Sequence, residues 1–437
     1  MSLPKKLRKS IITSAYTLSC RRNPLREQFA GLRSNYESNN YQERKLRKII
    51  KFSKKHSKYY TEKLSFITDD EIETAGLQEL LIKIPYLEKS DLRTKANEDI
   101  KIPGVKGIIR ETTGSTGIPV KVLVDRYTLA AQLKARWDFF AWHGILPGAI
   151  EGRFWGRKEQ RYLQSSIKNF LLNRKIFTLD NKDIDKFNRE LTILQNAKLD
   201  YFYGYPSLIL KAAELFDNKN KIKPNPKVIF TTAEMLTEIQ RRYISNVFGC
   251  PVFQEYGCSE VDIIAFECPN GHYHLNSERL YIEFLPVISG KYEVIISDLD
   301  NRCMPILRYK LGDLVELKSK GCDCGLPFSG ITRVVGRTSD RLVSLPDGTF
   351  FHAVKFSHLI EQACKRGWLV RQYRIDHIEP RNIHLKLEGE FYDSQKKSLE
   401  NFMINRLNIL TKKQIKTEII FCDIQDDGKH MYYRKYF

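Results

Sequence analysis

About a quarter of the way along, the chain reads Thr112-Thr113-Gly114-Ser115-Thr116-Gly117-Ile118-Pro119. This stretch separates a strand predicted over residues 107–110 from one predicted over 120–125. Hydroxyl and main-chain N–H groups can donate to phosphate oxygens, and the glycines let the backbone approach a phosphate closely. Most loops of this composition are ordinary turns. It is not a Walker loop, because the chain contains no Gly-x-x-x-x-Gly-Lys-Ser/Thr sequence. Alone, the stretch indicates either a phosphate-binding loop or a plain hairpin.

Predicted helices and strands alternate beyond this loop. Apolar residues recur at helical spacing over 128–143, and strands are predicted over 228–231 and 252–255. This alternation is typical of an α/β body with a partly parallel sheet. The composition changes near Gly336, and the hundred or so residues after it predict a compact α+β unit. We therefore expect two domains that meet near this glycine.

The chain has a net charge of +20, and most of the excess lies in residues 1–60, where sixteen Lys and Arg face three Glu. Such a segment could bind nucleic acid or an anionic membrane leaflet. However, Leu46, Ile49, Ile50 and Tyr60 recur at roughly helical spacing, as in a surface helix docked on a body. We favour the docked helix. We do not expect nucleic acid as a partner, because no basic stripe with stacking aromatics and no known binding module is present.

Other features of the 437 residues indicate a cytoplasmic protein. No apolar run reaches the ~18 residues of a membrane span, and we find no secretory signal. The nine cysteines are odd in number and scattered, which argues against a disulfide framework and for a reducing compartment.

Three further motifs follow the loop. They are Tyr256-Gly257-Cys258-Ser259-Glu260, Tyr309-Lys310-Leu311-Gly312-Asp313 and Gly336-Arg337-Thr338-Ser339-Asp340. Together with the loop, and in this order, they resemble the motifs of adenylate-forming enzymes, which include acyl-CoA synthetases, luciferases and peptide-synthetase adenylation domains. Three other segments make the chain similar to the phenylacetate–CoA ligase-like branch, some of whose relatives lie in capsule and surface-polysaccharide loci. These segments are Arg136-Trp137, Tyr203-Gly204-Tyr205-Pro206-Ser207 and Thr231-Thr232-Ala233-Glu234.

The resemblance covers the chain from about residue 40 to its end and implies a particular α/β architecture. We expect a large adenylate-forming domain with mixed sheets over 61–335 and a small mobile α+β lid over 336–437. The basic helical segment over 1–60 precedes them. Asp340 would be the hinge about which the lid turns.

The resemblance also assigns the residues that would bind ATP. Glu260 would bind Mg²⁺, Asp313 would take the ribose hydroxyls, and Lys429 would contact the carboxylate and α-phosphate. Without the resemblance, Lys429 reads as an ordinary tail lysine. Thr116 is counted with Glu260 and Lys429 as catalytic. The remaining ATP and AMP contacts would come from Thr112, Thr113, Gly114, Ser115, Gly117, Glu234, Tyr256, Gly257, Ser259 and Arg337.

Two positions depart from the family pattern. Val120 stands where many relatives have Lys, which leaves phosphate contact to hydroxyls and amides. Lys310-Leu311 replaces Arg-Thr, but Asp313 is retained.

The acyl pocket is less readable from the sequence. Arg136, Trp137, Tyr203 and Tyr205 are candidates to line it, with Arg136 near a polar end of the substrate. Aromatic residues at helical spacing are more often core residues than ligand contacts.

Two separated Cys/His clusters are candidates for a zinc site. Cys268 and the histidines His272 and His274 precede Cys322 and Cys324. Thiolate and imidazole are good Zn²⁺ ligands, and a structural site needs four of them. The alternative is a set of free or buried thiols, since Cys-x-Cys is tighter than the usual spacing. The resemblance implies a structural Cys/His/Cys/Cys site in which His274 is preferred, because it lies six residues after the first cysteine.

These observations predict an ATP- and Mg²⁺-dependent ligase that converts a small-molecule carboxylate to an acyl-adenylate. The acyl group would pass to a thiol, coenzyme A or a carrier's pantetheine arm, and coenzyme A is preferred. The alternative acceptor is an amine, giving an amide of an amino compound or sugar acid in surface-polysaccharide synthesis. The basic N-terminus could add peripheral contact with a membrane.

Overall fold

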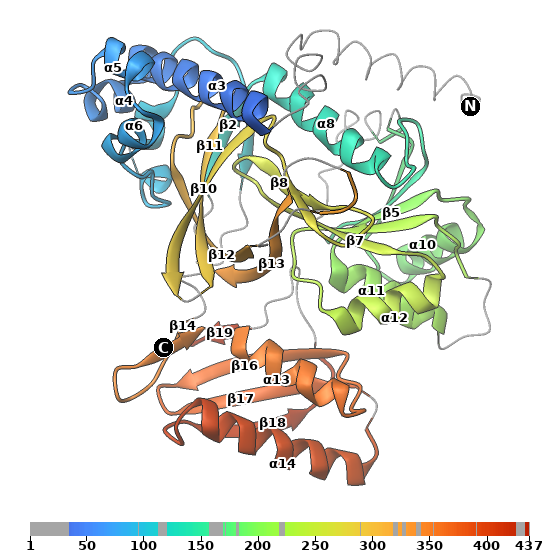
Figure 1. The fold of residues 1–437 in the computed structure, drawn as a ribbon. Coiled ribbons are helices and arrows are strands. Elements are labelled where there is room, and N and C mark those ends of the chain that lie inside the picture. Colours follow the sequence, from blue (N-terminus) through green and yellow to red (C-terminus); the bar gives the residue numbers. More distant parts are fainter. Residues whose placement is uncertain are drawn as a thin grey trace. The chain divides into compact units, whose positions relative to one another are not determined.

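The computed structural model describes most of the chain (Figure 1). The described residues are 35–94, 96–111, 120–156, 169–170, 172–180, 183–217, 223–288, 290–317, 322–325, 329–337, 342–352, 354–389, 391–424 and 433–436. They fall into two compact units. The first takes the described residues within Met1–Glu151, Tyr162–Arg174 and Phe253–Val334, and the second those within Gly152–Arg161, Lys175–Val252 and Val335–Phe437. The domain limits expected from the sequence remain predictions.

The first unit opens with a group of helices. They are α3 (Asn35–His56), α4 (Lys58–Lys63), α5 (Asp69–Thr74), α6 (Leu77–Lys83), the 3₁₀ helix η1 (Asp91–Arg93) and α7 (Ala96–Ile100). Leu46, Ile49, Ile50 and Tyr60 are all buried in the core of this unit. The docked helix predicted for the basic segment is thus confirmed for α3. None of the described helices is both long and apolar enough to cross a membrane.

The basic and polar side chains of α3 bind both carboxylates, such as Asp300 and Asp69, and main-chain oxygens. Gln42 donates to the carbonyls of Ser277 and Leu280, and Arg47 donates to those of Ile72 and Ala75. These polar and charged side chains therefore help to hold α3 on the first unit.

A two-stranded antiparallel sheet formed by β1 (Ile108–Glu111) and β2 (Lys121–Val124) follows. Helix α8 (Arg126–Ala141) begins directly after it. The Asp125 carboxylate caps this helix by accepting from the N–H groups of Tyr127 and Thr128. The predicted strands and helix on either side of residues 112–119 are confirmed.

A large mixed sheet contains most of the strands that precede Leu342. Its strands in the first unit are β7 (Val252–Cys258), β8 (Asp262–Glu267), β9 (Tyr273–Leu275), β10 (Leu280–Ile288), β11 (Lys291–Asp298), β12 (Tyr309–Leu317) and β13 (Ser329–Arg337). They lie in the order β10-β11-β12-β13-β9-β8-β7. The hairpins β7–β8, β8–β9 and β10–β11 are antiparallel.

The strands of this sheet assigned mainly to the second unit lie in the order β6-β5-β3-β4. They are β3 (Glu151–Phe154), β4 (Arg174–Phe177), β5 (Tyr201–Gly204) and β6 (Val228–Thr231), with the helices α10 (Ile184–Asn196), α11 (Pro206–Asp217) and α12 (Glu238–Phe248). Strands β5 and β6 are parallel and fully buried. This parallel pair with its helices confirms the predicted α/β character.

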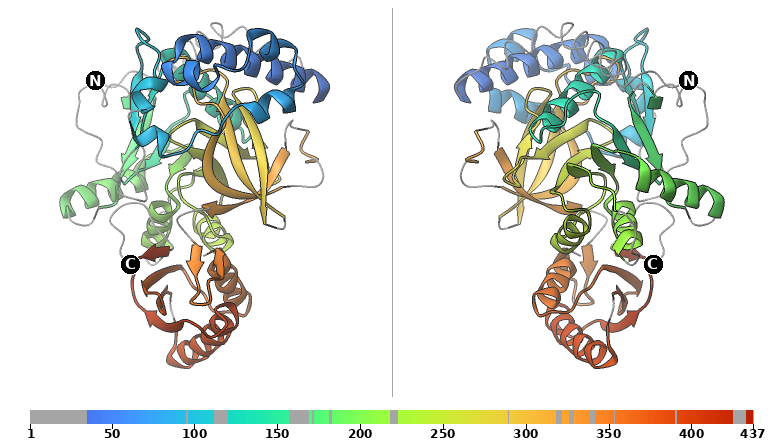
Figure 2. Two further views of the ribbon diagram at one scale, coloured as in Figure 1. Left: turned by 90° about the vertical axis from the view of Figure 1, so that its left-hand side faces the viewer. Right: turned by 90° about the vertical axis from the view of Figure 1, so that its right-hand side faces the viewer.

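The C-terminal part of the second unit contains a short hairpin and a four-stranded sheet. The hairpin is β14 (Leu342–Ser344) with β15 (Phe350–His352), and the sheet has the order β18-β17-β16-β19. Its strands are β16 (Gln372–Glu379), β17 (Asn382–Glu388), β18 (Lys416–Phe421) and β19 (Tyr433–Lys435). Helices α13 (Val354–Lys365) and α14 (Asp393–Leu410) lie on one face of this sheet (Figure 2). The sheet and its helices show the α+β character expected beyond Gly336, and a separate domain there remains a prediction.

Candidate active site

Two of the sequence motifs meet in the first unit, where β7, the turn after it and β12 come together. The Tyr256 hydroxyl donates a hydrogen bond to Asp313 Oδ2 at 3.0 Å. The Tyr309 hydroxyl donates one to Glu260 Oε1, also at 3.0 Å. All four side chains are buried. Each motif therefore supplies a phenol that binds the carboxylate of the other.

Several carboxylates lie near one another around these two hydrogen bonds. Burial raises the pKa of Glu293, Lys310 opposes the rise, and the charges of Glu88 and Asp313 increase it. Glu260 and Asp313 also raise the pKa of the Cys258 thiol, although burial is the larger cause. Because buried carboxylates require compensating charge, this cluster suits a bound cation.

Gly257 lies between the aromatic and acidic residues of its motif and is held close to the next strand. A Cβ at this position would lie 2.5 Å from the Asp262 carbonyl oxygen. The β7–β8 turn therefore requires glycine here, which explains the Tyr-Gly pair of the motif in steric terms.

Arg136, a candidate for the acyl pocket, lies in an ion-pair network on α8. Its Nη2 is 3.0 Å from Asp262 Oδ1, and its Nε is 3.4 Å from Glu255 Oε2. Arg110 approaches the same Asp262 oxygen at 3.5 Å. Burial raises the pKa of Asp262, but Arg136 and Arg110 outweigh burial and lower it. Neighbouring Trp137 is buried and packs edge-on against Phe140 at 5.7 Å between ring centroids.

The second unit gathers the other aromatic candidates at the end of β5. The Tyr205 ring lies 4.3 Å from that of Trp155, between centroids. The Arg153 guanidinium carbon lies 4.6 Å from the Tyr203 ring centroid. Gly204, between the two tyrosines, has φ +155°, and a Cβ there would lie 2.0 Å from the Phe154 carbonyl oxygen. The Tyr-Gly-Tyr sequence thus fixes an aromatic cluster that includes an arginine.

Glu234, predicted as a nucleotide contact, lies close to the same motif within the second unit. Its Oε2 accepts a hydrogen bond from the main-chain N–H of Ser207 at 3.1 Å, in the first turn of α11. The Thr232 N–H donates to the Gly204 carbonyl at 3.0 Å. These bonds join two motifs that the sequence separates by about 27 residues.

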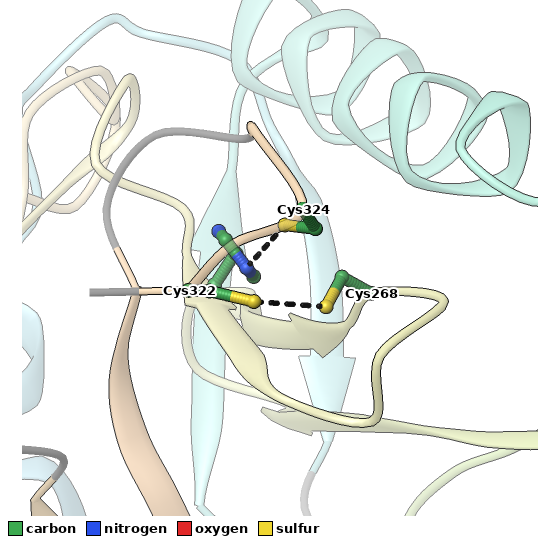
Figure 3. Close-up of side chains that lie close together, drawn as sticks. Cys268, Cys322 and Cys324 are labelled. Atoms are coloured by element: carbon green, nitrogen blue, oxygen red, sulfur yellow. Dashed lines mark hydrogen bonds between the residues drawn. The ribbon is translucent and has the colours of Figure 1, made fainter. Parts of the chain in front are cut away.

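The Cys/His clusters also come together, as Figure 3 shows for the three cysteines. One ligand atom from each of Cys268, His274, Cys322 and Cys324 lies within 4.8 Å of every other. Cys268 Sγ is 3.7 Å from Cys322 Sγ, and Cys324 Sγ is 3.3 Å from His274 Nε2. Three sulfurs and one imidazole match the donor set that Zn²⁺ prefers. The four residues predicted from the sequence therefore lie together, and their binding of zinc remains a prediction.

His272 is the remaining histidine of this region and lies outside that group of four. Its Nδ1 is 3.2 Å from Cys322 Sγ. Burial raises the pKa of the Cys322 thiol, but hydrogen bonds from the Cys324 main-chain amide and from both histidines outweigh burial and lower it to about 5. A thiol of low pKa is readily present as the thiolate that binds metal.

Several predicted site residues lie outside the described part of the chain. They are Thr112, Thr113, Gly114, Ser115, Thr116, Gly117, Asp340 and Lys429. Arg337 is the last residue of β13, and Ser259 is in the turn after β7, next to Glu260.

Sequence reasoning gave no role to Tyr309, Asp262 or Trp155, and it left Arg153 either to meet an acidic group or to lie on the surface. Tyr309 is the first residue of a recognised motif, so a signal existed for it. The other three became visible only through their neighbours in space: Asp262 beside Arg136, and Arg153 and Trp155 beside Tyr203 and Tyr205.

Comparison with protein-family models gives no match. Among curated proteins, the protein CapK of Staphylococcus aureus is 28% identical over 324 residues, which are 70% of this chain and 69% of CapK. A phenylacetate-coenzyme A ligase of Thermus thermophilus is 24% identical over 329 residues, which are 69% of this chain and 71% of that ligase.

Solved structures share the fold. A 2-hydroxyisobutyryl-CoA ligase in the postadenylation state has a TM-score of 0.73 at 16% identity, and the match covers 90% of this chain and 89% of that one. The GH3.15 acyl acid amido synthetase has a TM-score of 0.61 at 13% identity, covering 88% and 87%. By sequence and by fold, the chain is therefore similar to the AMP-forming ligases of the adenylate-forming superfamily. Within that superfamily, which activates carboxylates with ATP, it is phenylacetate–CoA ligase-like.

Proposed function

We propose that this enzyme converts a carboxylic acid to an acyl-adenylate and then transfers the acyl group to a thiol, with coenzyme A as the acceptor. A carboxylate is a poor electrophile, because its leaving group would be an oxide. Attack of the carboxylate on the α-phosphorus of ATP releases pyrophosphate and makes AMP the leaving group. The pairing of Tyr256 with Asp313 and of Tyr309 with Glu260 carries the proposal, because it supports ribose and Mg²⁺ sites in one place.

In this proposal Asp313 accepts hydrogen bonds from the ribose hydroxyls, and the Tyr256 ring borders the adenine. Glu260 would hold Mg²⁺, which offsets the charge of the polyphosphate when bound. Lys429 would stabilise negative charge on the α-phosphate. The hydroxyls and amides of residues 112–117 would cradle phosphate, while Gly257, Ser259, Glu234 and Arg337 complete the nucleotide contacts. A small domain turning about Asp340 would then admit the acceptor.

We assign a structural rather than catalytic role to the Cys/His cluster. Cys268, His274, Cys322 and Cys324 would hold Zn²⁺ with four protein ligands. A site filled in this way has no open position for a substrate. The metal would tie the β8–β9 hairpin to the segment between β12 and β13.

Amide formation is the second candidate for the acyl-transfer step. One protein that shares this fold is named an acyl acid amido synthetase, which is an amide-forming enzyme. The adenylation step would be common to both outcomes. On this alternative the acceptor is an amino compound or a sugar acid in surface-polysaccharide synthesis. The basic residues before α3 could hold either enzyme at an anionic membrane. Liposome binding by the chain with and without residues 1–34, at two salt concentrations, tests that contact; binding that is unchanged or insensitive to salt would contradict it.

ATP–pyrophosphate exchange across a panel of carboxylic acids tests the first half-reaction. We expect exchange with at least one acid, after which added coenzyme A or amines and mass analysis of the product identify the acceptor. Lys429→Ala should sharply lower exchange while ATP still binds, whereas Lys397→Ala, at an exposed position on α14, should not. No exchange with any acid, together with salt-dependent binding to RNA or DNA, would contradict the proposed function.

A further inference from the structure

We infer that Tyr309 is a positioning residue that orients the Glu260 carboxylate for Mg²⁺, a role that rests on the proposed adenylation. Its phenol makes a 3.0 Å hydrogen bond to Glu260 Oε1. The two residues are 49 positions apart in the chain, and both are almost wholly buried, with 1% and 4% of their surfaces exposed.

The backbone of Tyr309 is held from two sides. On β12 it pairs with Ile296 of β11, and it forms a parallel bridge with Leu87. Leu87 accepts from the Lys310 N–H at 3.0 Å and donates to the Arg308 carbonyl at 3.1 Å. The phenol therefore projects from a fixed point, which is what a positioning group requires.

Glu260 lies in a less regular part of the unit. It is in the turn between β7 and β8, next to the last paired residues, Cys258 and Asp262. A carboxylate on a turn has more freedom than one on a strand. The hydrogen bond from the rigid strand β12 limits that freedom by holding one of the two carboxylate oxygens.

The choice of donor matters electrostatically. Among the described residues, no Lys, Arg or His forms an ion pair with Glu260. A phenol is neutral, so it orients the carboxylate without cancelling its charge, whereas an arginine would do both. The full negative charge therefore remains for a divalent cation, and burial strengthens that attraction.

The simpler explanation is that Tyr309 only fills the core. The two explanations differ in what the hydroxyl does, since Tyr309→Phe keeps the ring and removes only the hydrogen bond. Tyr60→Phe is a matched control in the same unit. The Tyr60 hydroxyl is equally buried, accepts from the Leu307 N–H at 3.1 Å and donates to the Pro305 carbonyl at 3.3 Å, just before β12.

The experiment measures Mn²⁺ binding by electron paramagnetic resonance in the presence of a non-hydrolysable ATP analogue, alongside the Mg²⁺ dependence of pyrophosphate exchange. We expect Tyr309→Phe to raise the metal concentration needed for half-saturation by about 10-fold in both assays. This is the order of effect expected for losing a hydrogen bond to a charged group. Tyr60→Phe should lower the melting temperature and leave metal half-saturation unchanged.

A double-mutant cycle with Glu260→Gln shows whether Tyr309 acts through Glu260. In the Glu260→Gln background, Tyr309→Phe should cause no further loss of Mn²⁺ affinity. Wild-type metal affinity in Tyr309→Phe, or equal losses in Tyr309→Phe and Tyr60→Phe, would overturn the inference.

If Tyr309→Phe does not fold, Glu260→Asp replaces it, because the shorter side chain cannot bring its carboxylate to the Tyr309 phenol. Wild-type Mn²⁺ affinity in Glu260→Asp would also overturn the inference. Absence of exchange in the wild type would instead contradict the proposed function, and the Mn²⁺ titration would still report on Tyr309.

Discussion

The Tyr256 hydroxyl lies 3.0 Å from Asp313 Oδ2 and donates a hydrogen bond to it, although β7 and β12 are separated in the sheet by β13, β9 and β8. The bond spans 57 positions of sequence and is buried. We expect Asp313 to recognise the ribose and the Tyr256 ring to border the adenine. The hydrogen bond between them therefore fixes the position of the Asp313 carboxylate. One tyrosine thereby links the two halves of nucleoside recognition.

Tyr256→Phe should lower discrimination between ATP and 2′-deoxy-ATP. The ring remains to border the adenine, but Asp313 loses the donor that orients it. We expect the ratio of kcat/KM for the two nucleotides in pyrophosphate exchange to fall by about 5-fold, corresponding to about 1 kcal/mol for one hydrogen bond. Tyr273→Phe is the control, since its buried hydroxyl donates to Gln254 at 2.9 Å. An equal fall in both variants would contradict the prediction.

Cys322→Ser should remove bound zinc and lower stability. A structural zinc site contributes directly to folding free energy, and the wild-type protein, purified without chelator, should hold about one equivalent of metal. We expect less than half an equivalent in the variant, with a lower melting temperature. Cys422→Ser should retain its metal, because Cys422 is outside the cluster. Metal analysis and thermal unfolding are the measurements, and a metal-free wild type would contradict the site.

The two histidines of this region should behave differently. His274→Asn should lose zinc as Cys322→Ser does, because His274 Nε2 is one of the four clustered atoms and is fully buried. His272→Asn should keep zinc and only alter the surroundings of Cys322. The reverse result would exchange their roles.

His143 should make stability depend on pH. Burial lowers its pKa to about 4, partly opposed by the bond from Nε2–H to the Glu267 carbonyl, while the unfolded side chain keeps a value of 6.5. The unfolded state therefore binds more protons between these values, and stability falls as pH decreases from 6.5 to 4. From pH 7 to pH 5 we expect a loss of about 2 kcal/mol from this residue. The loss should be absent in His143→Gln, and denaturant unfolding at both pH values measures it; an equal loss in both proteins would refute this.

Ile50→Ala should reveal how firmly α3 is docked. Ile50 is fully buried, and truncating a buried isoleucine costs about 2–5 kcal/mol. Lys55→Ala, at an exposed position on the same helix, should change stability by less than about 0.5 kcal/mol. Urea unfolding compares them. Equal midpoints would show that the helix adds little to the first unit.

The sequence predicts individual elements well where local signals are strong. Strand β6 occupies the predicted residues 228–231, and helix α12 follows it at Glu238–Phe248. That helix is bounded by a Thr237 capping box and by Gly249 in the left-handed region, both of which are local features. The four residues of the Cys/His cluster could also be picked out from the sequence, because Cys and His side chains are the usual ligands of zinc.

The crosswise tyrosine–carboxylate pairs could not be predicted in the same way. Spacing along the chain does not say which carboxylate Tyr309 will reach, because the answer depends on how non-neighbouring strands of the large sheet approach one another. The partners of Arg136 could not be predicted from the sequence for the same reason, because they also depend on which elements lie side by side. The sequence suggested contact with the substrate, which stays a prediction, but it gave no sign of the ion pairs with Asp262 and Glu255.

The attachment of α3 relies in part on groups that every residue type carries. Gln42 and Arg47 reach main-chain oxygens of Ser277, Leu280, Ile72 and Ala75, and a carbonyl oxygen survives substitution of its side chain. The side chains on the receiving surface are thus free to change while the hydrogen bonds persist. Two such surfaces with little sequence in common could accept the same basic helix, so its mode of attachment can outlast sequence similarity.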